Sequence, residues 1–202
     1  MIINCYYYAP HNHTLLHEHL EADLARIAEL GTDAVSVCVQ ESQLTNWHQQ
    51  RLRNVVDAIH ASGMTAHAIP NRWAGLVAGW LDGFGKFTLE NADTLTRDVE
   101  GRTMARGEMV SCVHNPKVVE HIRVSLTQLF EHFDFDGLIW DEPHPQVCHC
   151  AYCTAINPFP DDNWCNGRLA QFLDEASLFA KSLRDDLVVS TFVQPHQAKL
   201  LN

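Results

Sequence analysis

The stretch DGLIWDEPHPQVCHCAYC brings together two kinds of chemically useful side chain. Two adjacent carboxylates, Asp141 and Glu142, end an apolar run, and three cysteines at Cys-x-Cys-x-x-Cys spacing begin six residues later. Carboxylates at a strand end move protons or bind hydroxyl groups, and clustered thiols bind soft metal ions. One loop therefore carries a candidate acid/base pair and a candidate metal site.

The two carboxylates lie at the expected end of a strand over residues 136–143, after Trp140 and before Pro143. Burial beside an aromatic surface raises the pKa of a carboxyl group, which then works as a proton donor. Glycoside hydrolysis needs such a donor and a second carboxylate about 5–9 Å away. The alternative is a solvated pair of acids, or acids that cap the next segment.

The three clustered cysteines are Cys148, Cys150 and Cys153. Zinc in a structural role takes four thiolate or imidazole ligands in a closed tetrahedron, so these thiols supply most of a site. No secretory signal precedes them, which favours a metal over a disulfide framework, although free thiols remain an alternative. The residues that could supply the fourth ligand are Cys112, Cys165, His114, His144 and His149.

The elements that position these residues alternate between strand and helix along the chain. Apolar, β-branched runs predict strands, and runs with helical spacing, several closed by glycine, predict helices. This alternation predicts an α/β fold with a parallel sheet and helices outside it. No glycine-rich phosphate fingerprint follows the first strand, so a (β/α)8 TIM-type barrel is favoured over a dinucleotide fold. The predicted strands are 2–9, 33–41, 65–71, 136–143 and 187–195, and the main helices are 15–31, 50–63, 117–133 and about 164–184.

The length of the chain limits how much of a barrel it forms. A complete barrel takes about 250 residues, whereas this chain has 202 and reaches a fifth strand. We therefore expect residues 1–202 to form a single barrel domain with only the first five βα units, truncated at its C-terminus. Residues 72–116 interrupt the alternation, and such long irregular connections usually serve a site.

Substrate contacts are expected at the ends of the third and fourth strands, because barrel enzymes bind ligands there. Asn71, Arg72 and Trp73 follow the third strand, and Trp140 and His144 flank the two acids of the fourth. An indole ring packs well against the C–H face of a sugar. Core packing is the alternative for the tryptophans, and an ion pair at the rim is the alternative for Arg72.

The composition limits the possible partners. The formal charge of -11 argues against nucleic acid and anionic membranes. The hydrophobic content of 46% and charged content of 19% are ordinary for a globular protein. We see neither an apolar run long enough to span a membrane nor a signal peptide, so the expected location is cytoplasmic. Assembly into a homo-oligomer is compatible with this composition.

A wider pattern resembles a known family. The segment RDVEGR (97–102), Cys112 and the motifs DGLIWDEP and CHCAYC are similar to the family 42 glycoside hydrolases, the zinc-carrying β-galactosidases. The resemblance implies a (β/α)8 barrel that hydrolyses O-glycosidic bonds with retention, with Glu142 as general acid/base. Asp141 stands where the family has asparagine, and we expect it to orient Glu142 or to bind a sugar hydroxyl. The zinc ligands that the resemblance implies are Cys112, Cys148, Cys150 and Cys153.

Two other functions stay open. His11 and His13 just after the first strand, with His196 after the fifth, resemble the metal-binding histidines of amidohydrolase barrels. There, zinc with an open coordination position would activate water. A barrel that binds carbohydrate without cleaving it is the second alternative.

Overall fold

The structure, a computed structural model, contains a five-stranded parallel sheet in which the strands follow one another in chain order. This confirms the predicted alternation of parallel strands and helices. The strands are β1 (Asn4–Tyr7), β2 (Ala34–Val39), β3 (Thr65–Pro70), β4 (Gly137–Asp141) and β5 (Val188–Phe192). The structure describes residues 3–7, 16–45, 49–77, 85–103, 109–143 and 145–193.

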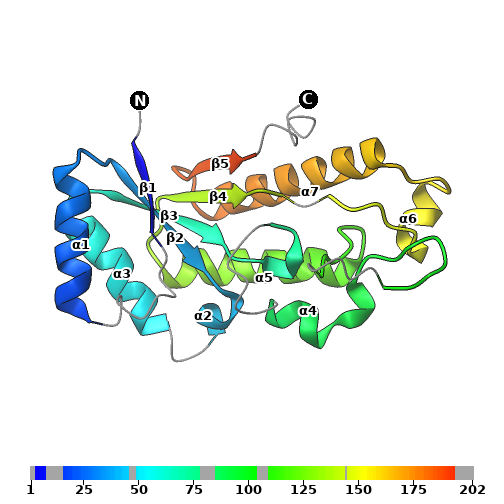
Figure 1. The fold of residues 1–202 in the computed structure, drawn as a ribbon, viewed down its shortest axis with the longest axis horizontal. Helices are drawn as coiled ribbons and strands as arrows, with labels where there is room; N and C mark the ends of the chain where they lie inside the picture. The colour runs from blue at the N-terminus through cyan, green and yellow to red at the C-terminus, as the bar shows by residue number, and fades with distance from the viewer. Residues whose placement is uncertain are drawn as a thin grey trace.

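Four long helices connect the strands, and shorter helical segments lie in the loops after β2, β3 and β4 (Figure 1). Within the described residues, no helix is both long enough and apolar enough to cross a membrane. The long helices are α1 (His17–Glu29), α3 (Gln49–Ala61), α5 (Pro116–His132) and α7 (Asp162–Leu183). The short segments are α2 (Glu41–Thr45), η2 (Trp73–Gly75), α4 (Lys86–Glu90), η3 (Ala92–Thr94) and α6 (Ala151–Ile156).

The main core lies between the sheet and the long helices. Alternate side chains of a strand point to opposite faces, and Val35, Val37 and Val39 of β2 all belong to this core. The other face carries a small separate cluster of Cys38, Ile69 and Ile139 from the three central strands. The helices therefore cover one face of the sheet over its central strands, and the opposite face is the inner face of a half-barrel.

The sheet is curved, and a contact between β1 and β4 shows it. The Tyr6 hydroxyl donates a hydrogen bond to Asp141 Oδ2 at 2.8 Å, although two strands lie between them. Strand pairing connects Tyr6 through β2 and β3 to Gly137, four residues before Asp141. Barrel strands are staggered in this way because they tilt against the barrel axis. The five strands therefore form a half-barrel. The hydrogen bond between Tyr6 and Asp141 crosses its inner face.

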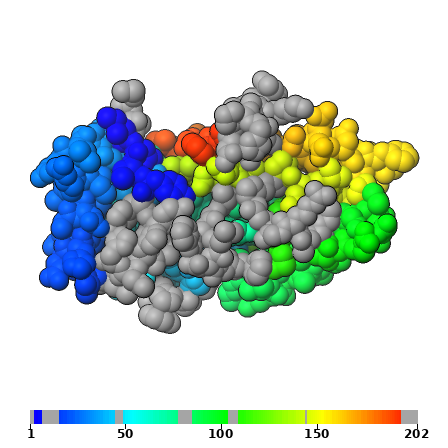
Figure 2. Space-filling model, viewed as in Figure 1, coloured from blue at the N-terminus to red at the C-terminus, as the bar shows by residue number. Residues whose placement is uncertain are grey.

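The two C-terminal helices are longer than the strands beside them. Helix α7 has 22 residues and a length of about 33 Å, whereas the five residues of β5 span about 17 Å. Helices α5 and α7 begin beyond the strand ends, and α6 lies at this end of the molecule, opposite α1 (Figure 1). We call residues 91–103, 109–115 and 145–165 the cysteine lobe, and we call the strands with α1, α3, α5 and the remainder of α7 the sheet unit. Figure 2 shows the elongated outline of the molecule in the same view.

Candidate metal centre and strand-end site

Four cysteines from separate segments meet in the cysteine lobe. The sulfur atoms of Cys112, Cys148, Cys150 and Cys153 all lie within 4.8 Å of one another. Cys112 Sγ is 3.3 Å from Cys153 Sγ and 3.5 Å from Cys150 Sγ. Cys150 is half-buried and the other three are buried, and together with Trp164 they form a small core of their own.

Backbone hydrogen bonds fix where these cysteines lie. The Cys112 N–H donates to Thr94 O at 2.8 Å, which fixes the entry to α5 against η3. The Arg97 N–H donates to Cys148 Sγ at 3.4 Å, and the His149 N–H donates back to Arg97 O at 2.8 Å. The segment around Arg97, which includes the RDVEGR motif, therefore holds the Cys-x-Cys loop in place.

The surroundings of Cys148 favour its thiolate. Hydrogen bonds from the Cys112 and Cys153 thiols, with backbone N–H groups of Cys150 and Arg97, hold the pKa of Cys148 far below its usual range despite burial. The hydrogen bond to Cys148 raises the pKa of Cys112, and bonds to both neighbours raise the pKa of Cys153. A metal ion bound by these thiols would replace their protons.

The cluster fits a tetrahedral thiolate site. Zinc–sulfur bonds of about 2.3 Å in a tetrahedron put the sulfur atoms about 3.8 Å apart, close to the separations between Cys112 and its neighbours. The four cysteines can therefore close around one metal ion. Of the other candidate fourth ligands, Cys165 is buried on α7 outside this group, and His144 lies outside the described residues.

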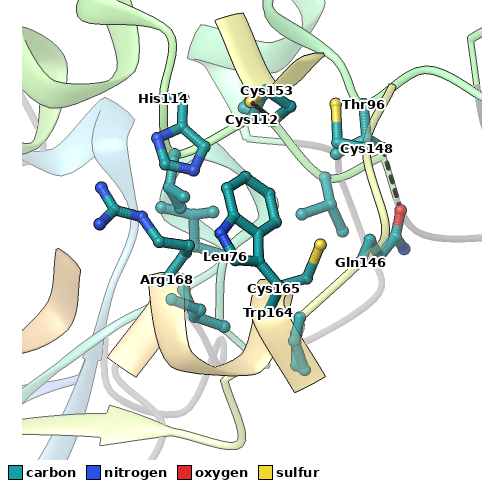
Figure 3. Close-up of a pocket in the computed structure, with 15 residues that line it drawn as sticks. Leu76, Thr96, Cys112, His114, Gln146, Cys148, Cys153, Trp164, Cys165 and Arg168 are labelled. Atoms are coloured by element: carbon teal, nitrogen blue, oxygen red, sulfur yellow. Dashed lines mark hydrogen bonds between the residues drawn. The ribbon is translucent and has the colours of Figure 1, made fainter. Parts of the chain in front are cut away.

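A small cavity lies beside the cluster, lined by Cys112, Cys148 and Cys153 and by Trp164, Cys165 and Arg168 of α7 (Figure 3). The His114 ring stacks on Trp164 with ring centroids 5.2 Å apart. Burial, and to a smaller extent the Arg168 charge, lowers the pKa of His114. The cavity leaves about 30 Å³ for the centres of water-sized molecules. That is room for one or two waters and too little for a sugar, so the cavity belongs to the packing of the lobe.

A second group of polar residues lies at the C-terminal ends of the strands. Asp141 ends β4 on the inner face of the half-barrel, where Tyr6 donates to it. The Cys38 thiol lies 3.5 Å from the Tyr6 hydroxyl oxygen. This group therefore combines side chains from β1, β2 and β4. The Asn71 N–H also donates a hydrogen bond to Val39 O, which extends the pairing of β3 with β2 to Asn71.

Strained backbone gathers at the same ends of the strands. Arg72 (φ 54°) and Ala74 (φ 50°) follow β3, and Glu142 (φ 40°) follows β4; these are the non-glycine residues with positive φ in the described part of the chain. Each such conformation costs about 1–3 kcal/mol and persists where the surroundings enforce it, often at functional sites. Gly75 is required because a Cβ there would lie 1.9 Å from Met109 O.

Several predicted substrate contacts are buried. Trp73 is 0% exposed and its indole N–H donates to Val39 O, whereas Trp140 is 2% exposed and donates to the Ser177 hydroxyl. Both rings therefore follow the core-packing alternative and support the strand ends from the helical side. Asn71 and Arg72 are 5% and 6% exposed, so they lie within the strand-end region and not on an open surface.

Sequence reasoning missed Tyr6, Cys38 and Glu41. Alternation along β1 and β2 places Tyr6 and Cys38 on the inner face, but the contact with Asp141 depends on the stagger of the barrel. Glu41 lies two residues after β2 and is 7% exposed, which its position alone does not predict. The histidines of the amidohydrolase alternative, His11, His13 and His196, lie outside the described residues.

No family model matches the sequence, and no curated protein matches it. Solved structures do match the fold, although identities this low show similarity of fold alone. Alpha-L-fucosidase isoenzyme 2 from Paenibacillus thiaminolyticus superimposes with a TM-score of 0.66 at 13% identity, over 95% of this chain and 32% of the fucosidase. The GH36 alpha-galactosidase AgaA from Geobacillus stearothermophilus gives 0.63 at 12% identity, over 95% and 28% of the two chains. The alpha-galactosidase TtGalA from Thermus thermophilus, in complex with stachyose, gives 0.57 at 15% identity, over 98% and 41%.

These comparisons support the partial (β/α) barrel fold, which this chain shares with solved glycosidases, and they do not support family 42 in particular. This chain spans about a third of the length of these three structures. The overlap agrees with the half-barrel seen in the strand order.

Proposed function

We propose that this half-barrel is part of a glycoside hydrolase that binds a carbohydrate at the C-terminal ends of its strands. One observation carries the proposal: the Tyr6–Asp141 hydrogen bond holds a carboxylate on the inner face of a barrel at the strand end. Ligands and catalytic groups collect at this end in (β/α)8 enzymes. The strained backbone of Arg72, Ala74 and Glu142 at the same end adds support.

The two adjacent acids have different roles in this proposal. Glu142 protonates the leaving oxygen and later activates water, and Asp141 orients Glu142 or binds a sugar hydroxyl. Neighbouring residues of a strand point in different directions, so the two do not form a facing pair. Cleavage with retention needs carboxylates about 5–5.5 Å apart across the bond, and the nucleophile then comes from another strand end.

We also propose that zinc is the ion in the cysteine lobe, with Cys112, Cys148, Cys150 and Cys153 as its ligands. Zinc supplies four strong bonds and takes no part in proton transfer when no coordination position is open. The four thiolates bind the ion, and the Arg97 N–H stabilises the charge on Cys148. The ion thereby fixes the loop that leaves β4 after Glu142.

The test is turnover and binding of p-nitrophenyl α-D-galactopyranoside and p-nitrophenyl α-L-fucopyranoside by the purified protein, chosen after the structurally similar enzymes. Glu142→Gln should lower turnover by about 10²–10⁴-fold, the usual contribution of general acid/base catalysis. Zinc content and the far-UV circular dichroism spectrum should stay unchanged. Asp141→Asn should weaken glycoside binding as well as turnover.

Glu131→Gln is the matched control, because Glu131 is exposed near the C-terminal end of α5, which leads into the opposite, N-terminal end of β4. Full turnover by the Glu142→Gln variant would refute the acid/base role. Glycoside binding without any turnover by the wild-type protein would favour the non-catalytic carbohydrate-binding alternative.

A further inference from the structure

We infer that Glu41 is a positioning residue that fixes the strained segment after β3 and thereby shapes the proposed carbohydrate site. This inference rests on the proposed function, and it concerns a residue that neither the motifs nor the fold comparison points to. Glu41 begins α2, two residues after the end of β2. Its side chain is 6% exposed.

The Glu41 carboxylate joins three other elements. Oε1 accepts hydrogen bonds from the Ala74 N–H of η2 at 3.1 Å and pairs with His121 Nε2 of α5 at 2.9 Å. Oε2 accepts from the Phe87 N–H of α4 at 2.7 Å. A buried carboxylate has lost its contacts with water, so these hydrogen bonds satisfy its two oxygen atoms.

The partners of Glu41 also reinforce one another. The Phe87 and His121 rings stack with centroids 4.1 Å apart and planes at 9°. Gly85 approaches closely, since a Cβ there would lie 3.3 Å from both Glu41 oxygens and 2.7 Å from Arg72 O. A larger residue at position 85 would therefore displace either the carboxylate or the backbone of Arg72.

The hydrogen bond to Ala74 explains how a strained backbone persists. Ala74 has φ 50°, which alanine adopts rarely, and its two peptide groups are both held. Its N–H donates to Glu41, and its carbonyl accepts from the Ser111 N–H at 2.9 Å. Without Glu41 the segment loses one of these two anchors, and Ala74 can relax toward negative φ.

The functional consequence follows from the position of the segment. Asn71 and Arg72 lie between β3 and Ala74, at the strand end where the carbohydrate is proposed to bind. Relaxation at Ala74 would move Arg72 but leave Asp141, on β4, in place. Loss of Glu41 should therefore weaken substrate binding more than it slows the chemical step.

The experiment compares Glu41→Ala and Glu41→Gln with the wild-type protein by amide hydrogen exchange and by kinetics with p-nitrophenyl α-D-galactopyranoside. In Glu41→Ala, the Ala74 and Phe87 amides should exchange at least about tenfold faster, with unchanged exchange in the β3 amides. KM should rise about tenfold and kcat should stay within about twofold. Glutamine has one acceptor oxygen, so Glu41→Gln should expose one of the two amides, and it serves as the test if Glu41→Ala does not fold.

Glu90→Gln is the matched control, because the Glu90 side chain is 58% exposed on α4 and should leave all these quantities unchanged. A merely structural role for Glu41 predicts faster exchange throughout β3, and that result would overturn the inference. Unchanged exchange at Ala74 and Phe87, or local exchange with unchanged KM, would also overturn it. If the wild-type protein binds neither glycoside, the proposed function fails, and the exchange data still decide whether Glu41 anchors the segment.

Discussion

The sheet unit and the cysteine lobe are stabilised in different ways. In the sheet unit, apolar side chains from β2, β3 and β4 pack against the long helices in one continuous core. In the cysteine lobe, the separate core consists of three buried cysteines, with Cys150 and Trp164 packed against them. The core of the cysteine lobe is therefore made mainly of cysteine side chains, whereas the core of the sheet unit is made of hydrocarbon side chains.

The difference follows from how much apolar surface each region can bury. A fully buried leucine or valine contributes about 1.5–3 kcal/mol, and the sheet unit has many of them. Helix α7 begins past the strands, and Trp164 in its first turn packs against the cysteines and not against the sheet. Small cores of this kind usually need a disulfide or a metal, and the proposed ion between four thiolates would provide such a cross-link.

The largest expected effect is the loss of the cysteine lobe when its ion is removed. Structural zinc sites bind with about 10–16 kcal/mol in isolated peptides at pH 7, more than a lobe of this size gains from packing. Cys153→Ser, or treatment with a strong chelator, should therefore unfold the lobe and leave the sheet unit folded. Amide hydrogen exchange should show lost protection in α6 and the first turns of α7, with protection retained in β2 and β3.

Cys165→Ser is the matched control for this experiment. Cys165 is also buried beside the cavity, but it does not belong to the group of four sulfur atoms. The variant should keep its metal and its lobe. Simultaneous loss of protection in β2 and the lobe on chelation would show that the two regions are one cooperative unit.

A substitution that creates a cavity in the main core should destabilise the sheet unit and leave the cysteine lobe intact. Leu126 is 0% exposed on α5, and Leu126→Ala should lower the free energy of unfolding by about 2–5 kcal/mol. Zinc content should not change. Val124→Ala, at a 42% exposed position of the same helix, should cost less than about 1 kcal/mol in the same urea titration. Loss of zinc from Leu126→Ala would contradict the separation of the two regions.

The sheet unit should also weaken in acid through Asp136. Burial alone raises the pKa of Asp136, but hydrogen bonds from His60 and the Ala66 N–H, with the charges of His60 and Arg184, hold it below its usual value. The stability that Asp136 contributes is therefore complete above the ordinary aspartate pKa of about 3.9. It is lost as pH falls below that value through the folded-state pKa.

Asp136→Asn should lower the free energy of unfolding by about 1–2 kcal/mol at pH 6 and flatten its decline below pH 4. Asp134→Asn is the control, because Asp134 also pairs with Arg184 but its side chain is 71% exposed. A variant as acid-sensitive as the wild-type protein would show that another group causes the decline.

The smallest expected effect concerns the helix that joins the two regions. The Asp161 side chain caps α7 by accepting a hydrogen bond from the Trp164 N–H at 2.8 Å. Asp161→Ala should destabilise the protein by about 1 kcal/mol. The metal should remain bound, because the cap is not a ligand; measured zinc loss would mean that the cluster depends on the first turn of α7.

The sheet unit could be predicted well from the sequence because its signals are local. Buried β-branched runs and glycine-terminated helices mark β2, β3, α1 and α3 to within a few residues. The grouping of Cys112 with the Cys-x-Cys-x-x-Cys motif came from a resemblance in the spacing of motifs, since the 35 residues between Cys112 and Cys148 carry no local signal for the contact.

The strand-end site was harder to predict, because its contacts depend on tertiary geometry. Tyr6 reaches Asp141 only through the stagger of the curved sheet, and Glu41 binds Ala74 and Phe87 through loops without regular spacing. The sequence allows Trp73 and Trp140 to be either sugar contacts or core residues. Their burial depends on which face of the strand end each residue occupies. Local pattern does not decide such cases.

X-ray absorption at the zinc K-edge on the purified protein tests most directly whether one ion bound by four thiolates holds the cysteine lobe. We expect one zinc per chain with four sulfur neighbours at about 2.3 Å, and a loss of that signal in Cys112→Ser. A protein with no stoichiometric metal, or a zinc ion with mainly nitrogen and oxygen neighbours, would contradict it.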